Sequence, residues 1–62
     1  MQARIIRRSE VEKLTGLSCS TIYTMMQEER FPRQVKLSKR AVGWLVSDIE
    51  AWINSRVELS QF

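Results

Sequence analysis

The 62-residue sequence contains no histidine, one cysteine, two glycines and one proline. Without histidine, the chain lacks the side chain that most often serves as a general base or a metal ligand. The single Cys19 cannot form a disulfide within the chain and has no second thiol with which to hold zinc. We expect it to be an inert small residue in a reduced, cytoplasmic protein. These absences predict that the protein is not an enzyme and needs no metal or cofactor.

Long apolar runs are also absent. No stretch approaches the roughly 20 residues that a membrane helix needs, and the basic residues 1–8 have no apolar signal-peptide core. A chain of this length forms one domain, here residues 1–62, whose small core leaves no room for a deep substrate pocket. The sequence therefore favours a binding protein that neither crosses a membrane nor takes a small-molecule substrate.

The positive charge is concentrated in one part of the chain. The whole sequence carries 10 Lys and Arg against 7 Asp and Glu, a net charge of +3. Residues 1–46 hold nine of the basic and four of the acidic residues, a net +5, and residues 47–62 have a net −2. A basic stripe of this kind favours binding to a polyanion, and the alternative is an ordinary solvated face.

Two short helices are expected in the first half of the chain. A capping box at Ser9 and Glu12 predicts the start of the first, with Val11 and Leu14 on its buried face. Gly16 ends that helix, because glycine tolerates the left-handed conformation that follows a helix terminus.

Ser18 is expected to cap a second helix, over residues 19–28. Ile22, Met25 and Met26 are spaced to form its buried face, and Pro32 stops it. The opposite face is polar and nearly free of charge. Ser20, Thr24 and Gln27 point away from the core, and Thr21, Tyr23 and Glu28 flank them.

After Pro32 the apolar residues alternate instead of following a helical period. Residues 34–37 and 41–45 therefore predict two strands, joined by a basic turn at residues 38–40. Gly43 in the second strand indicates a bulge or a close approach of two backbones.

A second capping box, Ser47 to Glu50, predicts a last helix of about ten residues. An apolar stripe on this helix is expected to complete the core. It comprises Ile49, Trp52, Ile53 and Val57.

The order helix, tight turn, helix, hairpin, helix predicts an α+β fold, mainly helical, of the small winged helix-turn-helix class. In such a fold the second helix enters the major groove of double-stranded DNA, and the hairpin is a wing that contacts phosphates. The expected base-contacting residues are Ser20, Thr21, Tyr23, Thr24 and Gln27. The expected phosphate-contacting residues are Arg7, Arg8, Arg33, Lys36, Lys39 and Arg40.

Three aromatic residues each have two interpretations. Tyr23 either stacks or hydrogen-bonds in the DNA groove, or packs against the hairpin at the edge of the core. Trp44 and Trp52 lie on apolar stripes, which favours a place in the core. The alternative is that the two tryptophans form the contact surface of a protein-interaction module, such as an anti-repressor.

Six short motifs follow one another along the chain. They are Leu14-Thr15-Gly16-Leu17-Ser18, Ser20-Thr21-Ile22-Tyr23, Phe31-Pro32, Val35-Lys36-Leu37, Val42-Gly43-Trp44 and Trp52-Ile53. In this order they resemble the AlpA family of prophage regulators, from about Ile6 to Arg56. The resemblance implies an excisionase-like and MerR-like winged helix. It also implies a bacterial or phage-encoded transcriptional regulator that acts on the nucleoid and activates an integrase or excision-related gene. The alternative is an architectural excision factor that bends attachment-site DNA.

The sequence departs from the pattern of that family at two positions. Cys19 stands where the family often has a basic residue, which implies one fewer interaction with a phosphate. Glu29 stands where the family commonly has glycine, so the second helix must end in another way or accept some strain.

We expect a monomer in solution, because MerR-like relatives dimerise through a long C-terminal helix and this chain ends at Phe62. Neighbouring copies are expected to bind DNA cooperatively. The sequence is compatible with an additional contact with RNA polymerase or an integrase.

Overall fold

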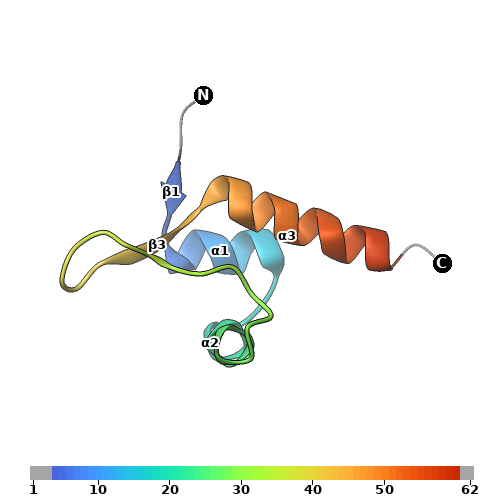
Figure 1. Cartoon of the computed structure of the whole chain (residues 1–62), viewed down its shortest axis with the longest axis horizontal. Coiled ribbons are helices and arrows are strands. Elements are labelled where there is room, and N and C mark those ends of the chain that lie inside the picture. Colours follow the sequence, from blue (N-terminus) through green and yellow to red (C-terminus); the bar gives the residue numbers. More distant parts are fainter. Residues whose placement is uncertain (1–3, 61–62) are drawn as a thin grey trace.

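The computed structural model describes residues 4–60, so the predicted domain limits at residues 1 and 62 lie outside the described part. The elements are β1 (Ile5–Ile6), α1 (Arg8–Thr15), α2 (Cys19–Gln27), β2 (Val35–Lys36), β3 (Val42–Leu45) and α3 (Val46–Leu59) (Figure 1). This arrangement of three helices and a small sheet confirms the expected α+β, mainly helical fold.

The sheet has three antiparallel strands in the order β1-β3-β2. Val35 pairs with Gly43 and Lys36 with Val42, which forms the predicted hairpin. β1 was not predicted. It runs along the other edge of β3, where Ile6 lies opposite Trp44. The first basic segment of the chain is therefore fixed to the hairpin and not only to α1.

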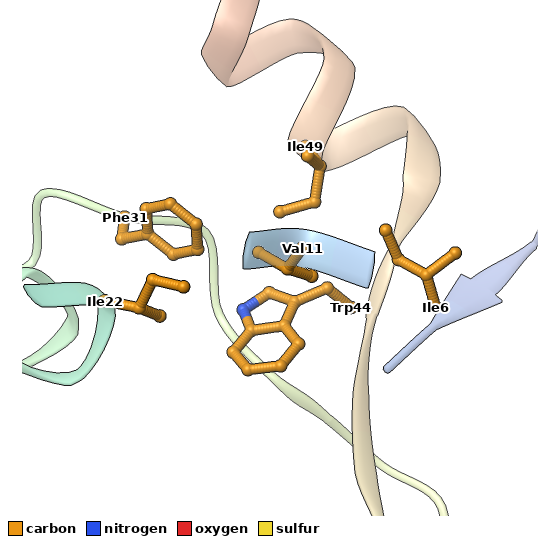
Figure 2. Packing of buried hydrophobic residues seen from close by; sticks show 6 residues of the cluster. All are labelled: Ile6, Val11, Ile22, Phe31, Trp44 and Ile49. Carbon is orange, nitrogen blue, oxygen red and sulfur yellow. The ribbon is translucent and has the colours of Figure 1, made fainter. Parts of the chain in front are cut away.

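Six buried apolar side chains form the core. Figure 2 shows that they converge from β1, the three helices, β3 and the segment after α2: Ile6, Val11, Ile22, Phe31, Trp44 and Ile49. Trp44 is fully buried, and its indole N–H donates a 3.1 Å hydrogen bond to the Pro32 carbonyl oxygen. The ring of Phe31 meets that of Trp44 edge-on at 6.4 Å, which ties the segment after α2 to the sheet.

The turn between α1 and α2 is formed as the sequence predicts. Gly16 has a φ of 74°, and its N–H donates a 2.8 Å hydrogen bond to the Glu12 carbonyl oxygen. Ser18 is the N-cap of α2, since its Oγ accepts a 3.3 Å hydrogen bond from the Thr21 N–H. Together they set the direction in which α2 leaves α1.

α2 ends in a strained cap. Glu29 has a φ of 57°, in the left-handed region that glycine adopts without cost. Its N–H donates to the Met26 carbonyl at 3.0 Å, and the Arg30 N–H donates to the Met25 carbonyl at 2.8 Å. This bonding pattern is the Schellman motif. Of the two outcomes expected for Glu29, the structure shows the one in which strain is accepted.

Both predicted capping boxes are wrong. α1 begins at Arg8, one residue before Ser9, and Glu12 pairs with Arg8 at 3.2 Å instead of reaching back to the cap. α3 begins at Val46, directly after β3, and the Val46 N–H donates to the Arg4 carbonyl at 2.9 Å. In both cases the adjoining strand fixes where the helix begins, so the serine hydroxyl is not used as a cap.

Two of the expected buried faces, at Leu14 and Val57, and the expected strand at residues 34–37 extend too far. Leu14, Leu37 and Val57 are all exposed. β2 stops at Lys36 because the N–H groups of Leu37 and Ser38 both donate to the Ala41 carbonyl, which closes the turn. α3 has 14 residues instead of about ten, and its last turns extend past the core, which leaves Val57 uncovered. Leu14 is likewise left uncovered, at the last turn of α1.

Candidate nucleic-acid interface

The outward face of α2 is open to solvent. All five predicted base-contacting residues are exposed: Ser20, Thr21, Tyr23, Thr24 and Gln27. On the opposite side of the helix, Ile22 is fully buried and Met25 and Met26 pack against the core. α2 is thus held by its apolar side while its polar side faces outward.

Three hydroxyl groups are linked at the start of α2. Ser18 Oγ lies 2.9 Å from Thr21 Oγ1 and 3.3 Å from Ser20 Oγ. A hydroxyl donates one hydrogen bond and accepts two, so Ser18 Oγ, which also accepts from the Thr21 N–H, is fully used, while the hydroxyls of Ser20 and Thr21 keep capacity for a further partner. The linkage restrains these side chains at the end of α2 that meets base edges first in helix-turn-helix proteins.

Tyr23 lies where α2 meets the hairpin. Its hydroxyl accepts a 3.3 Å hydrogen bond from the Gln34 side-chain amide, and 37% of the residue is exposed. It therefore borders the hairpin segment, as one of its two interpretations requires, and still presents part of its ring to solvent. The role of Gln34 in holding Tyr23 was not predicted, because no local pattern links residues 11 positions apart.

Beside Tyr23 the surface is hollowed over about 320 Å³. We call this feature the arginine hollow. Its lining comes from the start of α1, from α2 and from the hairpin: Arg7, Arg8, Ser9, Tyr23, Arg40 and Val42. Three of the six predicted phosphate-contacting residues therefore meet at one place, next to one of the predicted base-contacting residues.

The strand pairing that the sequence did not reveal explains this meeting. Ile5 and Ile6 of β1 pair with Leu45 and Trp44 of β3, in antiparallel register. The antiparallel direction points the chain after Ile6 toward the Val42 end of β3, and α1 begins there, with Arg7 as its N-cap. Arg7 and Arg8 are consequently brought beside Arg40, although more than thirty positions separate them in the sequence.

The charge of the arginine hollow is only partly balanced. Arg8 is paired with Glu12 at 3.2 Å. Within residues 4–60, neither Arg7 nor Arg40 has a carboxylate within 4.0 Å. A guanidinium offers several N–H donors in a plane that matches phosphate oxygens. The hollow therefore suits a phosphate group better than a neutral ligand.

The other predicted phosphate-contacting residues lie elsewhere. Lys36 and Lys39 are exposed on the hairpin and do not line the arginine hollow. Arg33 lies 4.0 Å from Glu29, and both side chains are almost fully exposed. Glu29 thus places a carboxylate next to one of the basic residues expected to meet DNA.

One alternative loses support from the geometry. Trp44 is fully buried, so it cannot form the surface of a protein-interaction module. Within residues 4–60, no three His, Cys, Asp or Glu residues are grouped to hold a metal ion. No helix in that range is long and apolar enough to cross a membrane.

A family model and one of two relatives name the same family. Residues 4–57 match the family described as prophage CP4-57 regulatory protein (AlpA). The chain is 45% identical over 56 residues to the uncharacterized protein ORF88 of enterobacteria phage P4, a match that covers 90% of the chain and 64% of ORF88. It is 31% identical over 62 residues to the DNA-binding transcriptional activator AlpA of Escherichia coli K12, covering 90% of the chain and 89% of that protein.

Proposed function

Because the chain belongs to the AlpA family of prophage regulatory proteins, we propose that it is a sequence-specific DNA-binding transcriptional regulator. The family is regulatory and not enzymatic. The name of the Escherichia coli relative supports activation as the direction of regulation. One observation carries the proposal: the exposed polar face of α2 lies beside the arginine hollow.

This juxtaposition matches the two kinds of contact that a DNA reader makes. α2 would lie in the major groove, where each base pair presents a distinct set of donors, acceptors and methyl groups. Ser20, Thr24 and Gln27 would contact base edges. The arginine hollow would receive a backbone phosphate and so fix the position of α2 along the duplex.

The hairpin would add further phosphate contacts. Lys36 and Lys39 are exposed on the wing, and Arg33 is exposed shortly after the end of α2. Such contacts raise affinity for all sequences and make binding depend on salt. We infer that residues 1–62 act as one DNA-binding module, in the cytoplasm of a bacterium and on its nucleoid.

A more specific part of the proposal concerns which gene the protein regulates. The family resemblance supports an integrase or excision-related gene. A footprint upstream of a promoter would support transcriptional activation. A footprint over a recombination site, with bending of the duplex, would support an architectural excision factor instead.

The test of base readout compares specific with random DNA. A preferred site is first selected from a random duplex pool with the unaltered protein. Ser20→Ala, Thr24→Ala and Gln27→Ala should each cost about 1–3 kcal/mol on that site if the side chain contacts a base. Affinity for random duplex should change much less.

Ser47→Ala is the matched control. Ser47 is an exposed serine on α3 whose hydroxyl caps no helix. Its substitution should leave both affinities unchanged. Equal losses on specific and random DNA for the α2 variants would contradict base readout by this helix.

A further inference from the structure

A second concave surface lies between the last turn of α1 and the C-terminal half of α3. This surface, the α1–α3 groove, is shallow and widely open to solvent, with a volume of about 440 Å³, and its lining includes Leu14, Thr15, Trp52, Ile53, Arg56 and Val57. Leu14 is 53% exposed and Val57 is 49% exposed. Exposed apolar side chains gathered in one groove are typical of a binding surface.

The α1–α3 groove lies away from the proposed DNA-binding surface. In Figure 1 the C-terminal half of α3 extends away from the hairpin, and α2 lies on the other side of α1 from α3. None of the residues lining the groove belongs to α2 or the hairpin. A partner could therefore occupy it while α2 and the arginine hollow contact DNA.

One charged side chain lies in this groove. The Arg56 guanidinium stacks over the Trp52 ring, 4.9 Å from its centroid. Its Nε atom is buried and has no hydrogen-bond partner within residues 4–60. This buried N–H is out of reach of a partner protein, but the terminal nitrogens of the guanidinium are not among the buried atoms, and a carboxylate would form charge-assisted bonds with them.

We propose that the α1–α3 groove binds an amphipathic helix of a partner protein, with apolar side chains against Leu14, Ile53 and Val57 and a carboxylate on Arg56. The groove is formed between two helices, and an added helix is the element that packs best against such a surface. Leu59, 60% exposed and one turn beyond Arg56, would extend the apolar contact. Although residues 47–62 carry a net −2, Arg56 is the one charged residue of the groove lining, so it would favour a carboxylate over an ammonium group at that point of the partner helix.

A second copy of this chain fits the groove less well. Two identical surfaces associate about a two-fold axis, so each residue near the axis meets its own equivalent. Pairing of two α3 helices near Arg56 would bring two guanidinium groups together without a carboxylate between them. An acidic helix from another protein has no such conflict.

The test uses two synthetic helical peptides of about 18 residues. Both carry leucines at positions i, i+3, i+4 and i+7, and they differ only in having glutamate or lysine at the remaining exposed positions. Each is titrated into the full isotope-labelled protein and followed by NMR. The glutamate peptide should shift the Trp52 indole and the α1–α3 groove residues, and should bind about tenfold more tightly than the lysine peptide.

Two variants make the result specific to the groove. Arg56→Gln should reduce the preference for the glutamate peptide to less than about twofold, whereas Arg4→Gln, the same change at an exposed arginine outside the groove, should keep it. Val57→Asp, at an exposed position, should abolish peptide binding and leave the fold intact by circular dichroism. DNA affinity measured alongside should respond little to Val57→Asp, which separates this proposal from the DNA-binding function.

Three outcomes would overturn the proposal. The first is equal binding of the two peptides or binding of neither. The second is a set of shifts centred on α2 and not on the groove. The third is self-association of the free protein that Val57→Asp abolishes, which would assign the groove to a second copy.

Discussion

Gly43 of β3 and Ile6 of β1 lie so close that a Cβ atom on Gly43 would stand 2.8 Å from the Ile6 carbonyl oxygen and overlap the Ile5 side chain. Only glycine leaves room for this approach. The approach in turn holds β1 along β3 and brings Arg7 and Arg8 to the hairpin. The absence of a Cβ atom at Gly43 thus allows the strand pairing that positions two arginines of the arginine hollow.

Gly43→Ala should therefore weaken both the fold and the DNA contact. The overlap with backbone atoms should destabilise the protein by roughly 1–3 kcal/mol, measured by urea unfolding. Displacement of β1 should also lower affinity for any duplex, even under conditions where the variant is fully folded.

Gly16→Ala is the control for this prediction. No atom lies within 4 Å of a Cβ built on Gly16, but its φ of 74° disfavours any other residue. Its cost of about 1 kcal/mol should come from backbone strain alone. DNA affinity of the folded Gly16→Ala protein should exceed that of the folded Gly43→Ala protein. Equal affinities would show that β1 does not position the arginines.

Glu29→Gly should stabilise the protein. Glu29 holds a left-handed backbone at a φ of 57°, which costs a residue with a side chain about 1–2 kcal/mol. Glycine relieves that strain but loses more conformational entropy on folding, so the net gain should be roughly 0.5–1 kcal/mol. The ion pair with Arg33, which this change removes, is exposed and contributes little.

The neighbouring glutamate provides the control. Glu28 has an ordinary φ of −87° and, like Glu29, forms one exposed ion pair. Glu28→Gly should destabilise the protein by roughly 0.5–1 kcal/mol. Urea unfolding of both variants measures the difference, and effects of the same sign would refute the role of the left-handed cap.

The parts of the fold that could be predicted are those with local signals. Gly16 and Ser18 mark the turn between α1 and α2, and the spacing of Ile22, Met25 and Met26 identifies the buried face of α2. β1 could not be predicted, because two residues are too short to show an alternating pattern.

The failures at the helix ends have the same origin. Ser9 and Ser47 match the capping-box pattern, but each lies within a helix that an adjoining strand starts earlier. Local propensity is a weak signal where pairing with a distant segment decides the boundary. The arginine hollow depends on the same pairing of β1 with β3. The individual phosphate-binding candidates could therefore be predicted from the sequence. That Arg7, Arg8 and Arg40 line one hollow could not.

Removing two charges at the tip of the hairpin should reduce non-specific affinity. Lys39 and Arg40 are exposed, and Arg40 also lines the arginine hollow. Changing both to alanine should weaken binding to all duplexes alike. The slope of log affinity against log salt should fall by about 0.9 for each phosphate that the variant no longer neutralises. An unchanged affinity and slope would show that the tip is only a solvated turn.

Free protein at micromolar concentration should sediment as a monomer and gain affinity on paired sites. A module of this size buries only about 600–1,000 Å² of its surface on DNA, at the low end for a specific complex. The expectation that α3 uses all its apolar residues in the core is wrong, since Val57 is exposed. Arg56 in the α1–α3 groove still opposes pairing of two α3 helices, so neighbouring molecules should meet only on DNA.

Gel shifts on one site and on two sites about 10 base pairs apart test this prediction. A spacing of about 15 base pairs is the control, because it places the second molecule on the opposite face of the duplex. Affinity per site should rise about tenfold or more only at the first spacing. A stable dimer without DNA, or the same affinity at both spacings, would disprove the prediction.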